Sequence, residues 1–192
     1  MDLREYQTLA MRTSPDGHDR ILNGCMGLIG ESGEIVDAVK KWKFQSGENA
    51  ALPVDKLIDE CGDVLWYCAE LATGLNTDLS YQAKQHGEWA GMIFSRSFLS
   101  RDICIDAIRI TQQCEWIFST LDGRDKRLFR GHINRQDEDA KPHLALILVS
   151  VQHFLRTYCT SGIEEAMTRN IEKLRKRYPD GFDPERSLHR AD

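Results

Sequence analysis

Residues 27–42 read GLIGESGEIVDAVKKW, and residues 59–67 read DECGDVLWY. Each stretch carries two acidic side chains three positions apart, which is about one turn of an α-helix, so each pair projects from one helix face. The four acids are Glu31, Glu34, Glu60 and Asp63. Four carboxylates brought together by two packed helices would repel one another strongly. We therefore expect a hard cation with oxygen ligands, Mg²⁺, to lie between them.

The composition limits the classes of function. The chain has 192 residues and a net charge of −5, which disfavours binding to nucleic acid. Polyphosphate substrates remain open, because a bound metal ion reverses the sign of a local site. No apolar run is long enough to span a membrane, and the start of the sequence has no signal-peptide pattern. The six cysteines form no CxxC motif and fit buried thiols in a reducing cytoplasm.

The apolar periodicity predicts an all-α helical bundle. We expect helices at residues 3–12, 18–44, 54–73, 78–94, 101–121, 144–158 and 162–178. Residues 122–141 are polar and charged and predict a loop, and residues 182–192 have no periodicity. A faint repeat relates residues 18–80 to residues 101–165, which suggests a degenerate tandem, pseudo-dimeric arrangement as one alternative. The second copy lacks the paired acids.

Glycines are unusually frequent beside the acids. Gly27, Gly30 and Gly33 lie in the first acidic helix, and Gly62 lies between the acids of the second. Each costs a helix about 1 kcal/mol relative to alanine. We expect the close approach of another backbone or of a ligand to explain them.

The same residues also have purely structural explanations. Acids three apart on a helix are usually a solvated face. Asp37 and Lys41 are spaced for a surface ion pair. The basic run at residues 173–177 could merely complement a helix C-terminus. Trp42 and Trp66 are candidates for stacking on a nucleobase, although tryptophans are more often core residues.

Three ordered blocks, at residues 27–37, 60–67 and 170–182, resemble the MazG-like all-α nucleoside triphosphate pyrophosphohydrolases. That family's pattern is ExxE, a spacer and ExxD, followed by a closing segment that looks like NIEKLRKRYPDGF here. The resemblance covers roughly residues 3–77 and 161–190. Within a single domain of residues 1–192, it leaves residues 78–160 as a helical insertion of about 80 residues before the closing segment.

The resemblance implies Mg²⁺-dependent hydrolysis of (deoxy)nucleoside triphosphates between the α- and β-phosphates, with Mn²⁺ as a substitute metal. By carry-over, the metal ligands would be Glu31, Glu34, Glu60 and Asp63, and Glu34 is our choice of general base. The substrate would be bound by Asn170, Lys173, Arg177, Tyr178 and Lys41.

The resemblance also implies a homo-oligomer, a dimer or a tetramer. The insertion puts this in question, because an added helix pair could complete within one chain a bundle that other members complete with a second subunit. It could equally form a lid or a specificity element. The competing function is a helical regulatory protein that kept the fold but turns over no substrate.

Overall fold

The computed structural model describes residues 1–97, 102–122 and 140–185, and these form helices without any strand. The helices are α1 (Leu3–Met11), α2 (Arg20–Gln45), α3 (Val54–Gly74), α4 (Leu79–Ser97), α5 (Ile103–Asp122), α6 (Lys141–Tyr158) and α7 (Ile163–Arg177). The all-α prediction is confirmed, and the first and last residues of every expected helix lie within three positions of those observed. The polar segment at 123–139 and the end of the tail at 186–192 lie outside the described residues.

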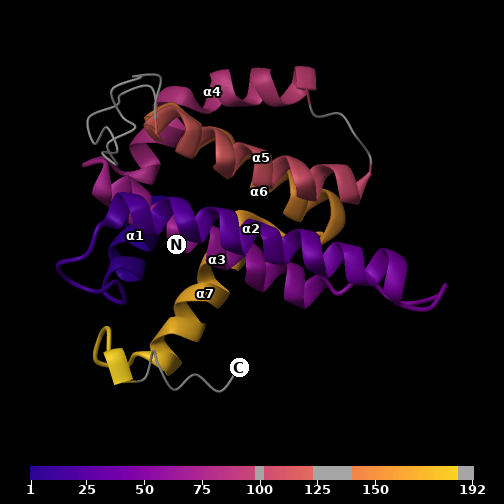
Figure 1. Ribbon diagram of the computed structural model, residues 1–192, viewed down its shortest axis with the longest axis horizontal. Helices are drawn as coiled ribbons and strands as arrows, with labels where there is room; N and C mark the ends of the chain where they lie inside the picture. Colours follow the sequence, from indigo (N-terminus) through magenta and orange to yellow (C-terminus); the bar gives the residue numbers. More distant parts are fainter. Residues whose placement is uncertain (98–101, 123–139, 186–192) are drawn as a thin grey trace.

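Four long helices form the centre of the molecule (Figure 1). α2 and α3 form one antiparallel hairpin, in which Gly24 meets Leu71 and Gly27 meets Tyr67. α5 and α6 form a second pair, with α5 against α2 and α6 against α3. One continuous apolar core draws residues from all seven described helices. Helices of the expected insertion therefore complete the bundle around the acidic hairpin.

The helix that follows each pair packs mainly on the other pair. α4 follows α3 but lies along α6, and α7 follows α6 but lies along α3. α4 and α7 consequently sit on opposite sides of the four-helix core (Figure 1). α1 packs against α3 and also touches α4 and α7. The tandem origin of this arrangement stays a prediction.

Local signals set the helix ends. The side chains of Asp2 and Asp19 accept hydrogen bonds from backbone N–H groups in the first turns of α1 and α2. Asn76 adopts a left-handed φ of 54° just after α3, as expected of a residue that closes a helix. Among the described residues, no helix is both long and apolar enough to cross a membrane.

The expected approach of another backbone is confirmed at Gly62, whereas at Gly27 the close neighbour is a side chain. A Cβ on Gly62 would lie 2.9 Å from the carbonyl oxygen of Ala166 in α7, and one on Gly27 would lie 2.1 Å from the ring of Tyr67. These glycines permit the close packing of α3 with α7 and of α2 with α3. No atom lies within 4 Å of a Cβ on Gly30 or Gly33, so packing within the described chain does not explain these two glycines. The approach of a ligand to them stays a prediction.

Candidate active site

Three of the four predicted acids converge between α2 and α3. One carboxylate oxygen from each of Glu31, Glu60 and Asp63 lies within 4.8 Å of the others, and all three side chains are half-buried. The antiparallel packing of α2 on α3 makes this possible, because it brings residue 31 level with residues 60–63.

Glu34 lies outside this group of three. Its side chain is exposed on α2, one turn beyond Glu31. It is still close enough for its negative charge to contribute to the raised pKa values of Glu31 and Glu60. Glu34 thus stands at the rim of the acidic group.

The acidic group is electrostatically costly. Burial, then the charges of Asp63 and Glu60, raise the pKa of Glu31 to about 7, although Lys173 opposes the shift. Burial also raises the pKa of Glu60, against the ammonium of Lys56 at 3.2 Å. Half-buried carboxylates that share one small space are the donor set that a hard divalent cation prefers. The residues present therefore fit Mg²⁺.

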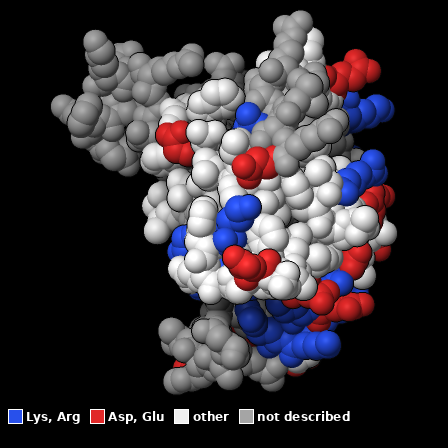
Figure 2. Space-filling model, turned by 90° about the vertical axis from the view of Figure 1, so that its right-hand side faces the viewer, with Lys and Arg blue, Asp and Glu red and all other residues white. Residues whose placement is uncertain are grey.

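α7 supplies the opposite wall. The ammonium of Lys173 donates to both carboxylate oxygens of Asp63 at 2.5 Å, and the amide nitrogen of Asn170 donates to one of them at 2.9 Å. Gly62 makes this possible, since any side chain there would push α7 away. Lys and Arg side chains gather in the lower part of the molecule in Figure 2, at the level of α7.

A cleft of about 250 Å³ opens beside the acids. Glu31 and Asp63 lie on its acidic side, and Lys173 and Arg177 lie on its basic side. The rest of the lining is mostly aromatic or small and polar. It consists of Thr13, Pro15, Asn23, Trp66, Tyr67, Leu174, Tyr178 and Phe182.

Tyr178 carries an unusual hydroxyl group. The residue is buried, and its ring packs on Phe182 with centroids 5.8 Å apart. Within the part of the chain that the structure describes, its buried hydroxyl has no hydrogen-bond partner. A buried polar group is rarely left in that state, so this hydroxyl has bonding capacity for a ligand in the cleft.

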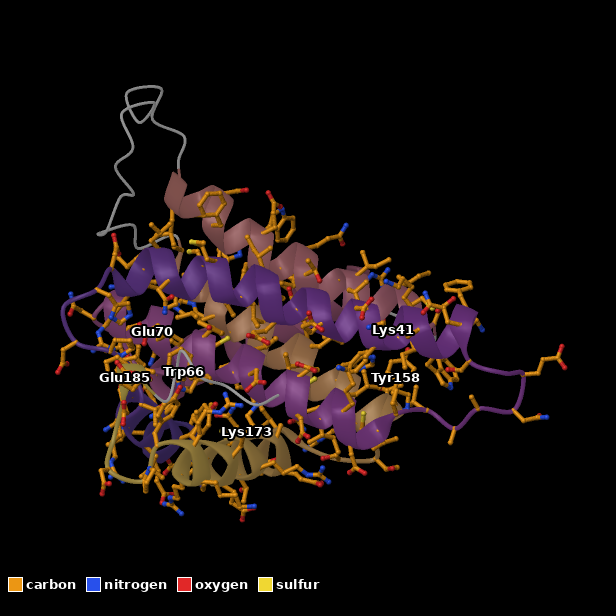
Figure 3. The ribbon with its side chains drawn as sticks, turned by 60° about the horizontal axis from the view of Figure 1, so that its bottom comes forward. Lys41, Trp66, Glu70, Tyr158, Lys173 and Glu185 are labelled. Carbon is orange, nitrogen blue, oxygen red and sulfur yellow. The ribbon has the colours of Figure 1, made fainter. Side chains whose placement is uncertain are left out.

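Two predicted residues lie elsewhere. The ammonium of Lys41 pairs with Asp37 at 2.5 Å, as the ion-pair reading expects, and does not line the cleft. Figure 3 shows Lys41 towards the opposite end of α2 from Trp66. Trp42 donates to the carbonyl oxygen of Ala50 and is also absent from the lining. Of the two tryptophan candidates, only Trp66 lies in the cleft.

Sequence reasoning missed several lining residues. Asn23 precedes Glu31 by eight positions, and Tyr67 follows Asp63 by four, so both could have been found by helical spacing. The edge of the Trp66 ring meets the Tyr67 ring at a centroid distance of 4.8 Å, and its indole N–H donates to Thr13. Phe182 ends the closing segment that resembles the family, whereas no pattern around Thr13 signals its position.

Comparison with known proteins agrees with this geometry. Residues 22–85 match the family model of the MazG nucleotide pyrophosphohydrolase domain, a span that contains all four predicted acids. The all-α structure fits that family, and the resemblance seen in the sequence is confirmed over residues 22–85.

Similarity to individual proteins is narrower. The Gene 37 protein of Mycobacterium phage L5 is 46% identical over 56 residues, which are 29% of this chain and 49% of that protein. The matched part thus spans about half of the relative's length, and the name of that protein states no activity. No solved structure matches.

Proposed function

We propose that this protein hydrolyses (deoxy)nucleoside triphosphates to the nucleoside monophosphate and pyrophosphate. Water would add across the anhydride linkage between the α- and β-phosphates. The observation that carries the proposal is the convergence of Glu31, Glu60 and Asp63. Two of these acids, Glu31 and Asp63, line a cleft whose facing wall holds Lys173 and Arg177. A polyphosphate with a bound metal ion requires carboxylates that hold the ion and, facing them, basic side chains that hold the phosphates.

Glu31, Glu60 and Asp63 would hold Mg²⁺, with Mn²⁺ as a substitute. The ion, when bound, supplies positive charge to the phosphates and lowers the pKa of coordinated water. Glu34, at the rim of the three acids, would complete the ligand set or accept the proton of the attacking water. An exposed carboxylate one turn from the ligands can reach a water molecule at the edge of the group.

The other side chains of the cleft would bind the substrate. Lys173 and Arg177 would contact the phosphates, and the free bonding capacity of the Tyr178 hydroxyl would serve a phosphate or sugar oxygen. Trp66 and Tyr67 offer aromatic surface for the base, and the Asn23 amide offers both a donor and an acceptor. Lys41 has no place in this assignment because it lies outside the cleft.

A regulatory protein that kept the fold is the second candidate. The raised pKa of Glu31, caused by burial and then by the charges of Asp63 and Glu60, argues against it, because a protein without catalysis gains nothing from keeping these acids together. We also infer that the enzyme acts in the cytoplasm on the nucleotide pool as a homo-oligomer, in keeping with its MazG-type domain.

A product assay tests the proposal. The eight common nucleoside triphosphates and dUTP would be incubated with Mg²⁺, and pyrophosphate would be separated from orthophosphate. Glu31→Gln and Glu34→Gln would run beside wild type, with Asp59→Asn as a matched control from the exposed face of α3. We expect pyrophosphate from wild type and the control, and its loss in both glutamate variants. Orthophosphate alone, or activity that survives Glu31→Gln, would refute the proposal.

A further inference from the structure

Tyr6 joins three helices at the back of the acidic group. Its side chain is 0% exposed, on α1. Its hydroxyl donates to the side-chain oxygen of Asn170 at 2.9 Å and approaches the carbonyl oxygen of Gly62 at 3.3 Å. Asn170 belongs to α7 and Gly62 to α3, so a single hydroxyl ties α1 to both helices that carry Asp63 and its partners.

Asn170 links the Tyr6 hydroxyl to Asp63 through a second hydrogen bond. Its side chain is only 3% exposed, and its amide nitrogen donates to the Oδ1 atom of Asp63 at 2.9 Å. An amide has one end that accepts and one that donates. Because the Tyr6 hydroxyl occupies the accepting end, the donating end is directed at Asp63.

We propose that Tyr6 is a positioning residue for the metal site, acting on the carboxylate of Asp63 through the amide of Asn170. The proposal rests on the assignment of Asp63 as a ligand in the proposed function. It also gives Asn170 a role other than substrate contact, since both ends of its amide are engaged within the protein.

The physical effect is on carboxylate orientation. A carboxylate on a two-bond side chain can rotate, and only some rotamers present an oxygen towards Glu31 and Glu60. A hydrogen bond from a fixed, buried amide to Oδ1 favours one rotamer. Groups behind metal ligands that orient them in this way typically contribute about 10- to 100-fold to metal affinity or activity.

The test uses Tyr6→Phe, which removes the hydroxyl and keeps the ring. Asn170→Ala and the double variant complete a thermodynamic cycle. Gln7→Leu is the matched control, because Gln7 neighbours Tyr6 on α1, is buried and bonds Thr73, Thr77 and Leu79, all away from Asp63. Two quantities are measured. The first is the affinity for Mn²⁺ without nucleotide, determined from the loss of the EPR signal of the free ion, and the second is the melting temperature.

We expect Tyr6→Phe to weaken Mn²⁺ binding about tenfold, in the range of outer-shell ligand partners. Gln7→Leu should lower the melting temperature at least as much and leave Mn²⁺ affinity within about twofold. In the Asn170→Ala background the Tyr6 substitution should have no further effect, because its route to Asp63 is gone.

Several results would overturn the proposal. The first is an unchanged Mn²⁺ affinity in Tyr6→Phe, and the second is a loss of affinity in Gln7→Leu as large as that in Tyr6→Phe. The third is full additivity of the two effects on Mn²⁺ affinity in the double variant. The readout does not depend on turnover. A wild-type protein that binds Mn²⁺ and hydrolyses nothing would refute the proposed function while the Tyr6 comparison still decides the positioning role. A wild-type protein that binds no Mn²⁺ would overturn the positioning role.

Discussion

The ammonium of Lys173 lies 2.5 Å from both carboxylate oxygens of Asp63. Lys173 is therefore the internal counter-ion of Asp63, as Lys56 is of Glu60, and the charge of Lys173 also opposes the raised pKa of Glu31. A metal ion that binds Asp63 must compete with this ammonium for the same oxygens. In the proposed function, Lys173 would then turn to the phosphates of the substrate, on the same wall of the cleft as Arg177.

Replacing Lys173 by methionine should separate metal binding from turnover. We expect Mg²⁺ to bind about fivefold more tightly, since a part-exposed ion pair is worth about 1 kcal/mol. The hydrolysis rate should fall by about 100-fold, as when a charge-stabilising donor is removed. Metal-dependent thermal shifts and product assays would measure the two effects. Lys176→Met, on the exposed side of α7, should change neither, and weaker metal binding in Lys173→Met would contradict the competition.

Two glycine substitutions in the acidic helices should have opposite effects. Gly62→Ala places a Cβ 2.9 Å from the Ala166 carbonyl oxygen and should cost about 1–3 kcal/mol of stability. Gly30→Ala meets no atom within 4 Å and should stabilise α2 by about 0.5–1 kcal/mol. Denaturant unfolding measures both. Only Gly62→Ala should reduce Mn²⁺ affinity, because α7 carries Asn170 and Lys173; equal stability changes would contradict the packing described.

The raised pKa of Glu31 predicts a pH dependence of stability in metal-free protein. The folded protein holds this proton up to about pH 7, whereas a model carboxyl releases it near 4.5. Stability from this group is therefore complete below pH 4.5 and is lost as pH rises to about 7. After discounting for partial exposure, we expect the free energy of unfolding of Glu31→Gln to exceed that of wild type by about 1–2 kcal/mol at pH 8. The two should agree at pH 4.5.

Chemical unfolding in EDTA from pH 4.5 to pH 8 would measure this difference. Mg²⁺ should restore the stability of wild type at pH 8 and not add to that of Glu31→Gln. A difference that is independent of pH would contradict the shifted pKa.

Tyr178→Phe should raise KM without lowering stability. The hydroxyl is buried without a partner among the described residues, so its removal should change stability by zero to about +1 kcal/mol. Loss of its contact with substrate should raise KM about fivefold to tenfold. Tyr158 is the matched comparison, since its hydroxyl donates to Asp106 at 2.6 Å. Tyr158→Phe should lower the free energy of unfolding by about 1–2 kcal/mol and leave KM unchanged.

Calorimetry and steady-state kinetics would distinguish the two tyrosines. A Tyr178→Phe protein with unchanged KM would remove this residue from the substrate site.

Periodicity was sufficient to predict every helix to within three residues at each end, although the pattern at residues 78–94 was weaker than the others. It also predicted the meeting of Glu31 with Glu60 and Asp63. It could not separate Glu31 from Glu34: residues three apart differ by about 60° around a helix axis, and only the exact packing of α2 on α3 decides which one faces the partner.

Helix geometry could have excluded Lys41, which lies ten residues, or about 15 Å, beyond Glu31 along the same helix. The contact of Tyr6 with Asn170 could not be predicted, because it joins residues 164 positions apart through the crossing of α1 and α7 over α3. Such contacts depend on tertiary packing and leave no local pattern.

The placement of α7 on α3 has a consequence for synthesis on the ribosome. A nascent chain that has emerged through α6 already contains the three carboxylates but not Asn170, Lys173 or Arg177. Asp63 then lacks the ammonium of Lys173, and the cleft lacks one wall. α7 thus completes the site only after both acidic helices have been made, and a chain released before α7 would offer nucleotides a cleft without its basic wall.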